Sequence, residues 1–183
     1  MHQTTTLFSL IAAATLIGGC SSYRDAETNQ TSANERSVQT TDAIARFKAE
    51  DPSIQKFFDN SYGYVVFSEI TKGAIGVGAA HGEGGIVYEN GRRIGTAEVT
   101  QVTVGAQLGG QSYAEIVFFQ NEAAMETFKS NNLEFSANAS AVAASAGAAA
   151  TADYSDGVAV FTMPNGGLMF EASIGGQKFK YYP

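Results

Sequence analysis

The sequence contains a single cysteine, Cys20, and this scarcity excludes several kinds of site. An intramolecular disulfide or a thiolate zinc cluster needs more than one thiol. Histidine is almost as rare, since His2 lies near the start and His81 is the only other one. His81 with the nearby Glu83 makes neither a zinc site nor a catalytic triad, because each requires a third group. We therefore expect no metal, no cofactor and no enzymatic activity.

Basic residues are also few, with 11 Lys and Arg against 18 Asp and Glu, which gives a net charge of −7. Nucleic-acid binding requires clustered positive charge that can replace the counterions around phosphate. A nucleic-acid partner is therefore not expected.

The N-terminal apolar segment runs from Leu7 to Ile17 and is shorter than the ~20 residues that a membrane-spanning helix needs. It is followed by Gly18-Gly19-Cys20 and resembles the secretory signal of a bacterial lipoprotein, although no Lys or Arg precedes it. We expect residues 1–19 to be removed and Cys20 to be the lipid attachment site, which would make the membrane a partner. Ser21, in place of an Asp, favours an outer-membrane lipoprotein that faces the periplasm.

Residues 20–40 contain few large apolar side chains and no hydrophobic period, which predicts a disordered tether. Two short helices are expected next, at 42–48 and 53–60, with Asp51 as an N-cap and Pro52 at the first helical position. Two interpretations of these helices stay open. They cover one face of a sheet, or they bring Phe57 and Phe58 to a lipid interface.

The stretch from Tyr62 to Tyr88 is rich in glycine and alternates like a strand, with Ile75 and Val77 on its bulky side. Its opposite side is nearly bare, and we expect a second layer to pack closely on Gly76 and Gly78. These glycines imitate a dinucleotide-binding loop only loosely, because strand sequence follows them where that site requires a helix.

Further strands and helices are expected along the rest of the chain. The stretch from Leu133 to Ala152 is rich in alanine, so a helix is the alternative to a strand there. The expected elements are a hairpin turn at 89–92, a strand 98–108 that ends at Gly109-Gly110, a strand 113–119, a helix 122–129 capped by Asn121, a strand from Leu133 to about Ala144, and a hairpin of 157–163 and 168–174 joined by 164–167. The predicted fold class is α+β: a strongly twisted, mostly antiparallel sheet or partly closed barrel with short N-terminal helices and one internal helix.

Several ordered sequence blocks follow one another along the chain: Gly63–Phe67, Ile70–Gly73, Gly76–Gly78, Gly82–Gly84, Gln107–Tyr113, Glu115–Phe119, Asp153-Tyr154 and Gly166–Met169. Together they resemble the SYLF family of lipid-binding domains, some members of which are associated with actin. The resemblance covers residues 41–183, which we expect to form one SYLF-like domain. It implies a domain that binds lipid or another amphiphile. A structural envelope protein that binds another protein is the alternative.

Three basic residues of the central region, Lys72, Arg92 and Arg93, are candidate contacts for lipid headgroups. Lys72 is expected in a turn, and the two arginines follow the Asn90-Gly91 turn, so two hairpin ends could bring the three together. The competing interpretation is that they are solvated or pair with Glu69 and Glu89.

Overall fold

The computed structural model describes residues 20–131, 134–136, 141–143 and 145–183. The chain divides into two compact units, 1–34 and 35–183. In the first unit the described residues are the beginning of helix α1 (Cys20–Glu50), and the second unit contains the sheet and its core. Among the described residues, no helix is both long enough and apolar enough to cross a membrane.

Helix α1 includes the segment 21–40, for which we expected a disordered tether. That prediction is wrong for these residues because a polar composition does not by itself prevent a helix. Neither glycine nor proline occurs between Cys20 and Glu50, so nothing in the local sequence interrupts the helical hydrogen bonds. The helix then ends just before Pro52, at which the 3-10 turn η1 (Pro52–Ile54) begins.

Two helix starts lie where the capping residues predicted them. Asp51 accepts a hydrogen bond from the Ser53 amide and caps η1, which leads directly into α2 (Gln55–Asn60). Asn121 accepts a hydrogen bond from the Ala124 amide and caps α3 (Glu122–Lys129). Side chains that satisfy the first free amides of a helix fix its start locally, so the sequence alone was sufficient here.

Three long strands dominate the sheet: β1 (Gly63–Glu89), β2 (Arg92–Phe119) and β5 (Val158–Tyr182). The strand order is β1-β2-β5-β3, with β3 (Glu134–Ser136) antiparallel to β5, while β4 (Ala141–Ala143) pairs with β5 in parallel. A short helix, α5 (Ala148–Thr151), precedes β5. The α+β class with a mostly antiparallel sheet is confirmed, and the sheet is open between its described edge strands β1 and β3.

The predicted strand boundaries are only partly correct. The turn between β1 and β2 is confirmed, with positive φ at Asn90 (48°) and Gly91 (76°). Gly109-Gly110 does not end a strand, because β2 pairs with both neighbours on either side of these residues. The predicted hairpin at 164–167 is also wrong: β5 continues through it, and Pro164 lies at a register shift where a missing amide hydrogen is tolerated. Of the predicted strand 133–144, β3 and β4 are seen, and the remainder lies outside the described residues.

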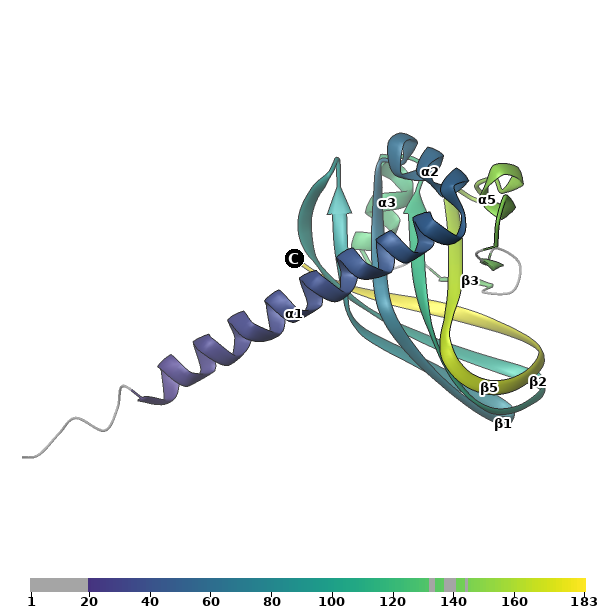
Figure 1. Cartoon of the computed structure of the whole chain (residues 1–183), viewed down its shortest axis with the longest axis horizontal. Coiled ribbons are helices and arrows are strands. Elements are labelled where there is room, and N and C mark those ends of the chain that lie inside the picture. Colours follow the sequence, from purple (N-terminus) through teal and green to yellow (C-terminus); the bar gives the residue numbers. More distant parts are fainter. Residues whose placement is uncertain (1–19, 132–133, 137–140, 144) are drawn as a thin grey trace, which may run out of the picture. The chain divides into compact units, whose positions relative to one another are not determined.

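The long sheet folds back on itself, so that its two ends lie face to face. We call residues 63–70, 113–119 and 158–163 the proximal arm, and residues 80–89, 92–101 and 177–182 the distal arm. The Phe67 and Phe179 rings, one from each arm, have centroids 6.1 Å apart, and the Tyr64 and Tyr88 rings stack at 4.8 Å. Figure 1 shows β1, β2 and β5 curving together at one end of the fold. We call the segments between the two arms, residues 71–79, 102–112 and 164–176, the bend. Register shifts in β1 near Gly76 (φ 73°) and Gly84 (φ 67°) allow this curvature.

The proximal arm is covered on both faces. One face packs against the distal arm and α3 in a core that includes Phe67, Phe119 and Phe128. The other face packs against α1, α2 and α5. Phe57 of α2 is 2% exposed and Phe58 packs edge-on against Phe118, so these phenylalanines cover the sheet and do not reach a lipid interface.

The expected second layer at the glycines exists, but at other positions. A Cβ at Gly76 would meet no atom within 4 Å, so the prediction is wrong there, whereas Gly78 is buried. Close approach occurs where the arms meet: a Cβ on Gly85 would lie 2.5 Å from the Phe67 ring, and one on Gly82 would lie 2.7 Å from Ile70.

Candidate functional site

Five large aliphatic side chains are exposed on the outer surface of the bend, and we call them the apolar patch. Cross-strand register places Ile75 opposite Leu108 and Val77 opposite Val104, with Val102 one position further along the same face. Their exposures are 83% for Ile75, 62% for Leu108, 61% for Val77, 62% for Val104 and 55% for Val102. Side chains that are directly opposite on adjacent strands touch, so these residues form one contiguous surface.

The inner surface of the same strands is polar, which reverses the usual arrangement. Lys72, Gln101 and Thr103 are buried on the inside, while valines that alternate with them point outward. An antiparallel sheet with one solvated face normally turns its polar residues to water. An outward apolar face therefore marks a surface that meets something other than water.

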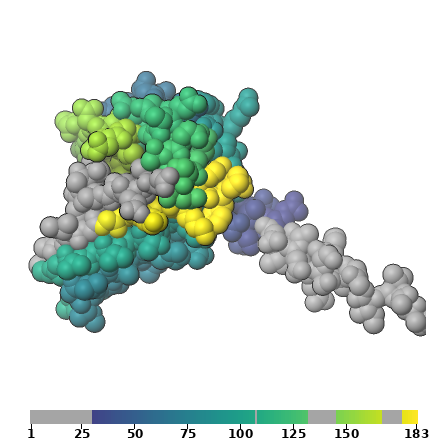
Figure 2. All heavy atoms as spheres, turned by 180° about the vertical axis from the view of Figure 1, so that it is seen from behind, coloured from purple at the N-terminus to yellow at the C-terminus, as the bar shows by residue number. Residues whose placement is uncertain are grey.

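Charged residues are few in the chain segments that form the bend, where Lys72 is buried on β1 and Glu171 belongs to β5. The sequence contains no Asp, Glu, Lys or Arg at 73–82, 99–114 or 157–170. These three segments belong to β1, β2 and β5, which pair with one another in this region. Figure 2 shows atoms of β1 and β2, in teal, along the lower edge of the folded unit. A surface without charge can enter an apolar phase without the large cost of desolvating an ion.

A polar cluster lies inside the fold, between the two arms. The Tyr113 hydroxyl donates a hydrogen bond to Gln101 (3.0 Å), and the Gln177 amide donates one to the carboxyl group of Glu115 (2.8 Å). Glu115 is fully buried, and this burial raises its pKa to about 7, with the Gln177 hydrogen bond opposing the shift.

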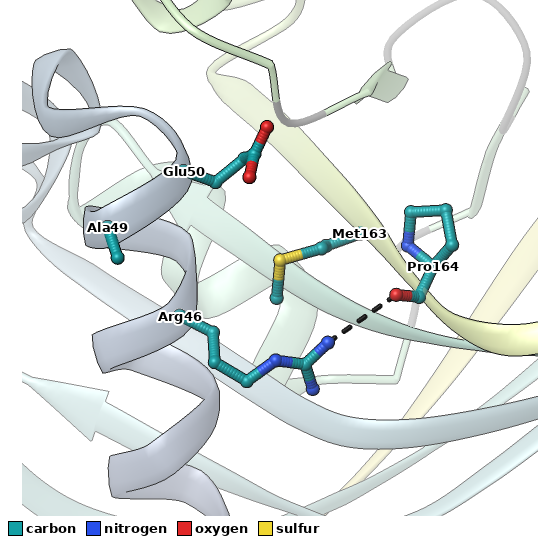
Figure 3. Close-up of a pocket in the computed structure, with 5 residues that line it drawn as sticks. All are labelled: Arg46, Ala49, Glu50, Met163 and Pro164. Carbon is teal, nitrogen blue, oxygen red and sulfur yellow. Dashed lines mark hydrogen bonds between the residues drawn. The ribbon is translucent and has the colours of Figure 1, made fainter.

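A cavity of about 510 Å³ lies between α1 and β5 and is lined by Arg46, Ala49, Glu50, Met163 and Pro164. Figure 3 shows Arg46 reaching from α1 toward the Pro164 carbonyl, and the guanidinium also donates to Asn165 Oδ1 (2.8 Å). An adjoining cavity is lined by Arg46 together with the acidic residues Asp42 and Glu69. Because acidic residues line the same cavities as Arg46, this region offers little attraction to an anionic ligand, and Arg46 connects α1 to β5.

The structure does not bring the three predicted headgroup contacts together. Lys72 lies within β1 rather than in a turn, pairs in register with Gln111 and is 4% exposed. Arg92 and Arg93 are exposed at the start of β2, at the other end of β1. Glu89, a suggested partner of the arginines, contacts Lys129 at 3.1 Å. Contact of these basic residues with headgroups stays a prediction.

The remaining predicted residues are placed as follows. Cys20 is the first residue of α1, and its acylation stays a prediction. His81 contacts Glu83 at 2.9 Å, and both are exposed. Within the described residues, no group of three or more His, Cys, Asp or Glu side chains could hold a metal ion.

Sequence reasoning missed both the direction of the apolar patch and the buried acid. The alternation of the sequence places Val102, Val104 and Leu108 on one side of the expected strand 98–108, but alternation does not say which side faces solvent. The signal for Glu115 was its position in the apolar strand 113–119, where a charged residue is unusual.

The fold and its outer surface define an α+β domain with an exposed apolar surface. Residues 100–181 match the family model Ysc84, described as Las17-binding protein actin regulator. The chain is also 28% identical over 137 residues to Beta cell expansion factor A of Aeromonas veronii, a match that covers 75% of this chain and 52% of that protein. The chain thus spans about half the length of this curated relative. Both matches agree with the resemblance to the SYLF family that the sequence blocks indicate.

Proposed function

We propose that this protein binds lipid membranes through the apolar patch and is held at the bacterial envelope by an acylated Cys20. The single observation that carries the proposal is the contiguous set of five aliphatic side chains, 55–83% exposed, on a part of the sheet with few charged residues. In this proposal the anchor places the protein on the periplasmic side of the outer membrane, and the patch enters the acyl region.

The energetics of the patch favour a lipid partner. Full burial of a valine, leucine or isoleucine side chain contributes about 1.5 to 3 kcal/mol, so even partial burial of this set contributes several kcal/mol. Protein interfaces are enriched in aromatic residues and arginine, whereas the patch is made of Ile, Val and Leu. The hydrocarbon of a bilayer offers no hydrogen-bonding partners and suits a purely aliphatic surface.

The test is vesicle binding by the chain from residue 21 onward, with Val77 and Val104 both changed to Thr. Threonine keeps the β-branched shape and suits a strand, so the fold should persist. We expect binding to phosphatidylcholine vesicles to weaken at least about tenfold, since each change removes part of the transfer free energy.

The matched control is Val38→Thr, because Val38 is 61% exposed like Val77 but lies on α1. It should leave vesicle binding unchanged. Equal binding by the wild-type chain and the double variant, with unchanged melting temperatures, would refute the patch as the lipid site. Anchoring is tested separately with Cys20→Ser in cells, and an unchanged share of protein in the membrane fraction would refute acylation.

A second candidate is a structural envelope protein that acts through a protein partner, because the matched family is described by binding to a protein and by regulation of actin. The same variants separate the two. Loss of a specific protein partner in the double variant, with no vesicle binding in the wild type, would favour this alternative.

A further inference from the structure

Two hydrogen bonds cross the space between the arms at the base of the bend. Tyr113 donates to Gln101, and Gln177 donates to Glu115. Gln101 and Gln177 are register partners in the distal arm, whereas Tyr113 and Glu115 lie two residues apart in the proximal arm. The pair of bonds therefore ties the arms together and encloses residues 102–112 of β2, which carry part of the apolar patch.

The Glu115 and Gln177 side chains each retain an oxygen without a partner. Glu115 Oε1 and Gln177 Oε1 are buried and accept no hydrogen bond, while the Gln177 amide already donates to Glu115 Oε2. An ionised Glu115 leaves two buried acceptors without donors and places a charge in the interior away from water, which is costly. A proton on Glu115 Oε1 supplies the missing donor, because the carboxyl group can then donate to Gln177 Oε1 and close a two-bond ring.

Other charged or titratable groups lie near this inner surface on β1, β2 and α3. On β1, Lys72 is buried opposite Gln111, four residues from Glu115 along β2. On β2, the Tyr113 hydroxyl is engaged with Gln101. On α3, which packs into the same core, Lys129 pairs with Glu89 and Glu126.

We propose that Glu115 and Gln177 form a proton-dependent clasp that holds the two arms of the sheet together when Glu115 is protonated and loosens when it ionises. The clasp does not depend on what the apolar patch binds. It makes the bend the part of the sheet whose opening responds to pH.

The direction of the pH dependence follows from the burial of the Glu115 carboxyl group. Its pKa is raised from 4.5 to about 7 in the folded protein. The native state therefore holds a proton that the unfolded or opened state releases between these values. The contribution of the clasp is fully present below about pH 4.5 and is lost as pH rises through about 7.

The experiment is amide hydrogen exchange of the full chain at pH 5.5 and pH 8, corrected for the intrinsic pH dependence of exchange. In the wild type, protection of residues 102–112 should fall on the order of tenfold to hundredfold at pH 8, since each pKa unit corresponds to a tenfold change. Glu115→Gln should abolish this difference, because two carboxamides can form the same ring at any pH.

The matched control is Tyr113→Phe, which removes the neighbouring hydrogen bond without touching the proton site. It should lower protection at both pH values and keep the wild-type ratio of protection between pH 5.5 and pH 8. A Glu115→Gln chain that keeps this wild-type ratio would overturn the clasp. As a second measurement that needs no variant, ¹³C NMR of the Glu115 carboxyl group should show a midpoint near 7, and a midpoint near 4.5 would equally overturn it.

Discussion

Asp51 joins two segments of the chain, η1 and α5, through one carboxylate. Its Oδ1 accepts from the amide and hydroxyl of Ser53 (3.0 and 2.6 Å), and its Oδ2 accepts from the amide of Ala149 (2.7 Å) at the start of α5. The side chain is 2% exposed, so its loss leaves buried amides without an acceptor. Asp51→Ala should lower the free energy of unfolding in urea by about 1 to 3 kcal/mol. The exposed Asp59, which accepts from Gln55 within α2, is the matched control, and its change to Ala should have a much smaller effect.

Asp51 also gives a pH dependence opposite in sign to that of Glu115. Burial would raise its pKa, but the hydrogen bonds from Ser53 and from backbone amides outweigh burial and lower the pKa below 3.8. A lowered pKa contributes stability above the unfolded value that is lost as pH falls through the folded one. Asp51→Asn should therefore flatten the decline in unfolding free energy below about pH 4, and an unchanged decline would contradict this role.

At the scale of elements, the approach of the arms depends on glycine at particular positions of β1. A Cβ on Gly85 would lie 2.5 to 2.9 Å from three carbons of the buried Phe67 ring, whereas one on Gly73 would meet nothing within 4 Å. Gly85→Ala should cost about 1 to 3 kcal/mol through overpacking. Gly73→Ala should be neutral or stabilise by up to about 1 kcal/mol, because it restricts the unfolded chain. Thermal unfolding of both variants tests this, and equal melting temperatures would mean that the arms do not meet at Gly85.

The elements that sequence predicted well are those fixed by local chemistry. Asn90-Gly91 and the cap Asn121 act within a few residues, so their positions follow from residue type. The failures are non-local: Gly109-Gly110 and Pro164 look like breaks in isolation, but pairing with neighbouring strands carries the chain through them. The outward direction of the apolar patch could not be predicted for the same reason. Alternation defines two faces of a strand, and only the fold decides which of them is buried. The family resemblance rests on several ordered sequence blocks and not on one motif. The matched family model and the curated relative agree with it.

At the scale of the whole molecule, charge and apolar surface are separated. The net charge is −7, yet segments 73–82, 99–114 and 157–170 of the three long strands carry no Asp, Glu, Lys or Arg. An acidic body should be repelled by anionic lipid, while an uncharged apolar patch should be indifferent to headgroup charge. Attraction by Arg92 and Arg93 would act in the opposite direction, so the salt dependence of vesicle binding separates the two contributions.

The last prediction is that added salt strengthens binding of the chain from residue 21 onward to anionic vesicles and leaves binding to neutral vesicles unchanged. All the charged side chains lie beyond residue 20, so this chain keeps the full excess of acidic residues. Raising the salt from 0.01 M to 0.15 M shortens the screening length from about 30 Å to about 8 Å and should remove most of the repulsion. Arg92→Gln with Arg93→Gln should weaken binding at low salt by no more than about 1 kcal/mol for each charge lost and should not abolish it. Flotation assays over this salt range are the measurement. Binding that falls steeply with salt in the wild type, and is abolished in the arginine variant, would assign the lipid contact to Arg92 and Arg93 and not to the apolar patch.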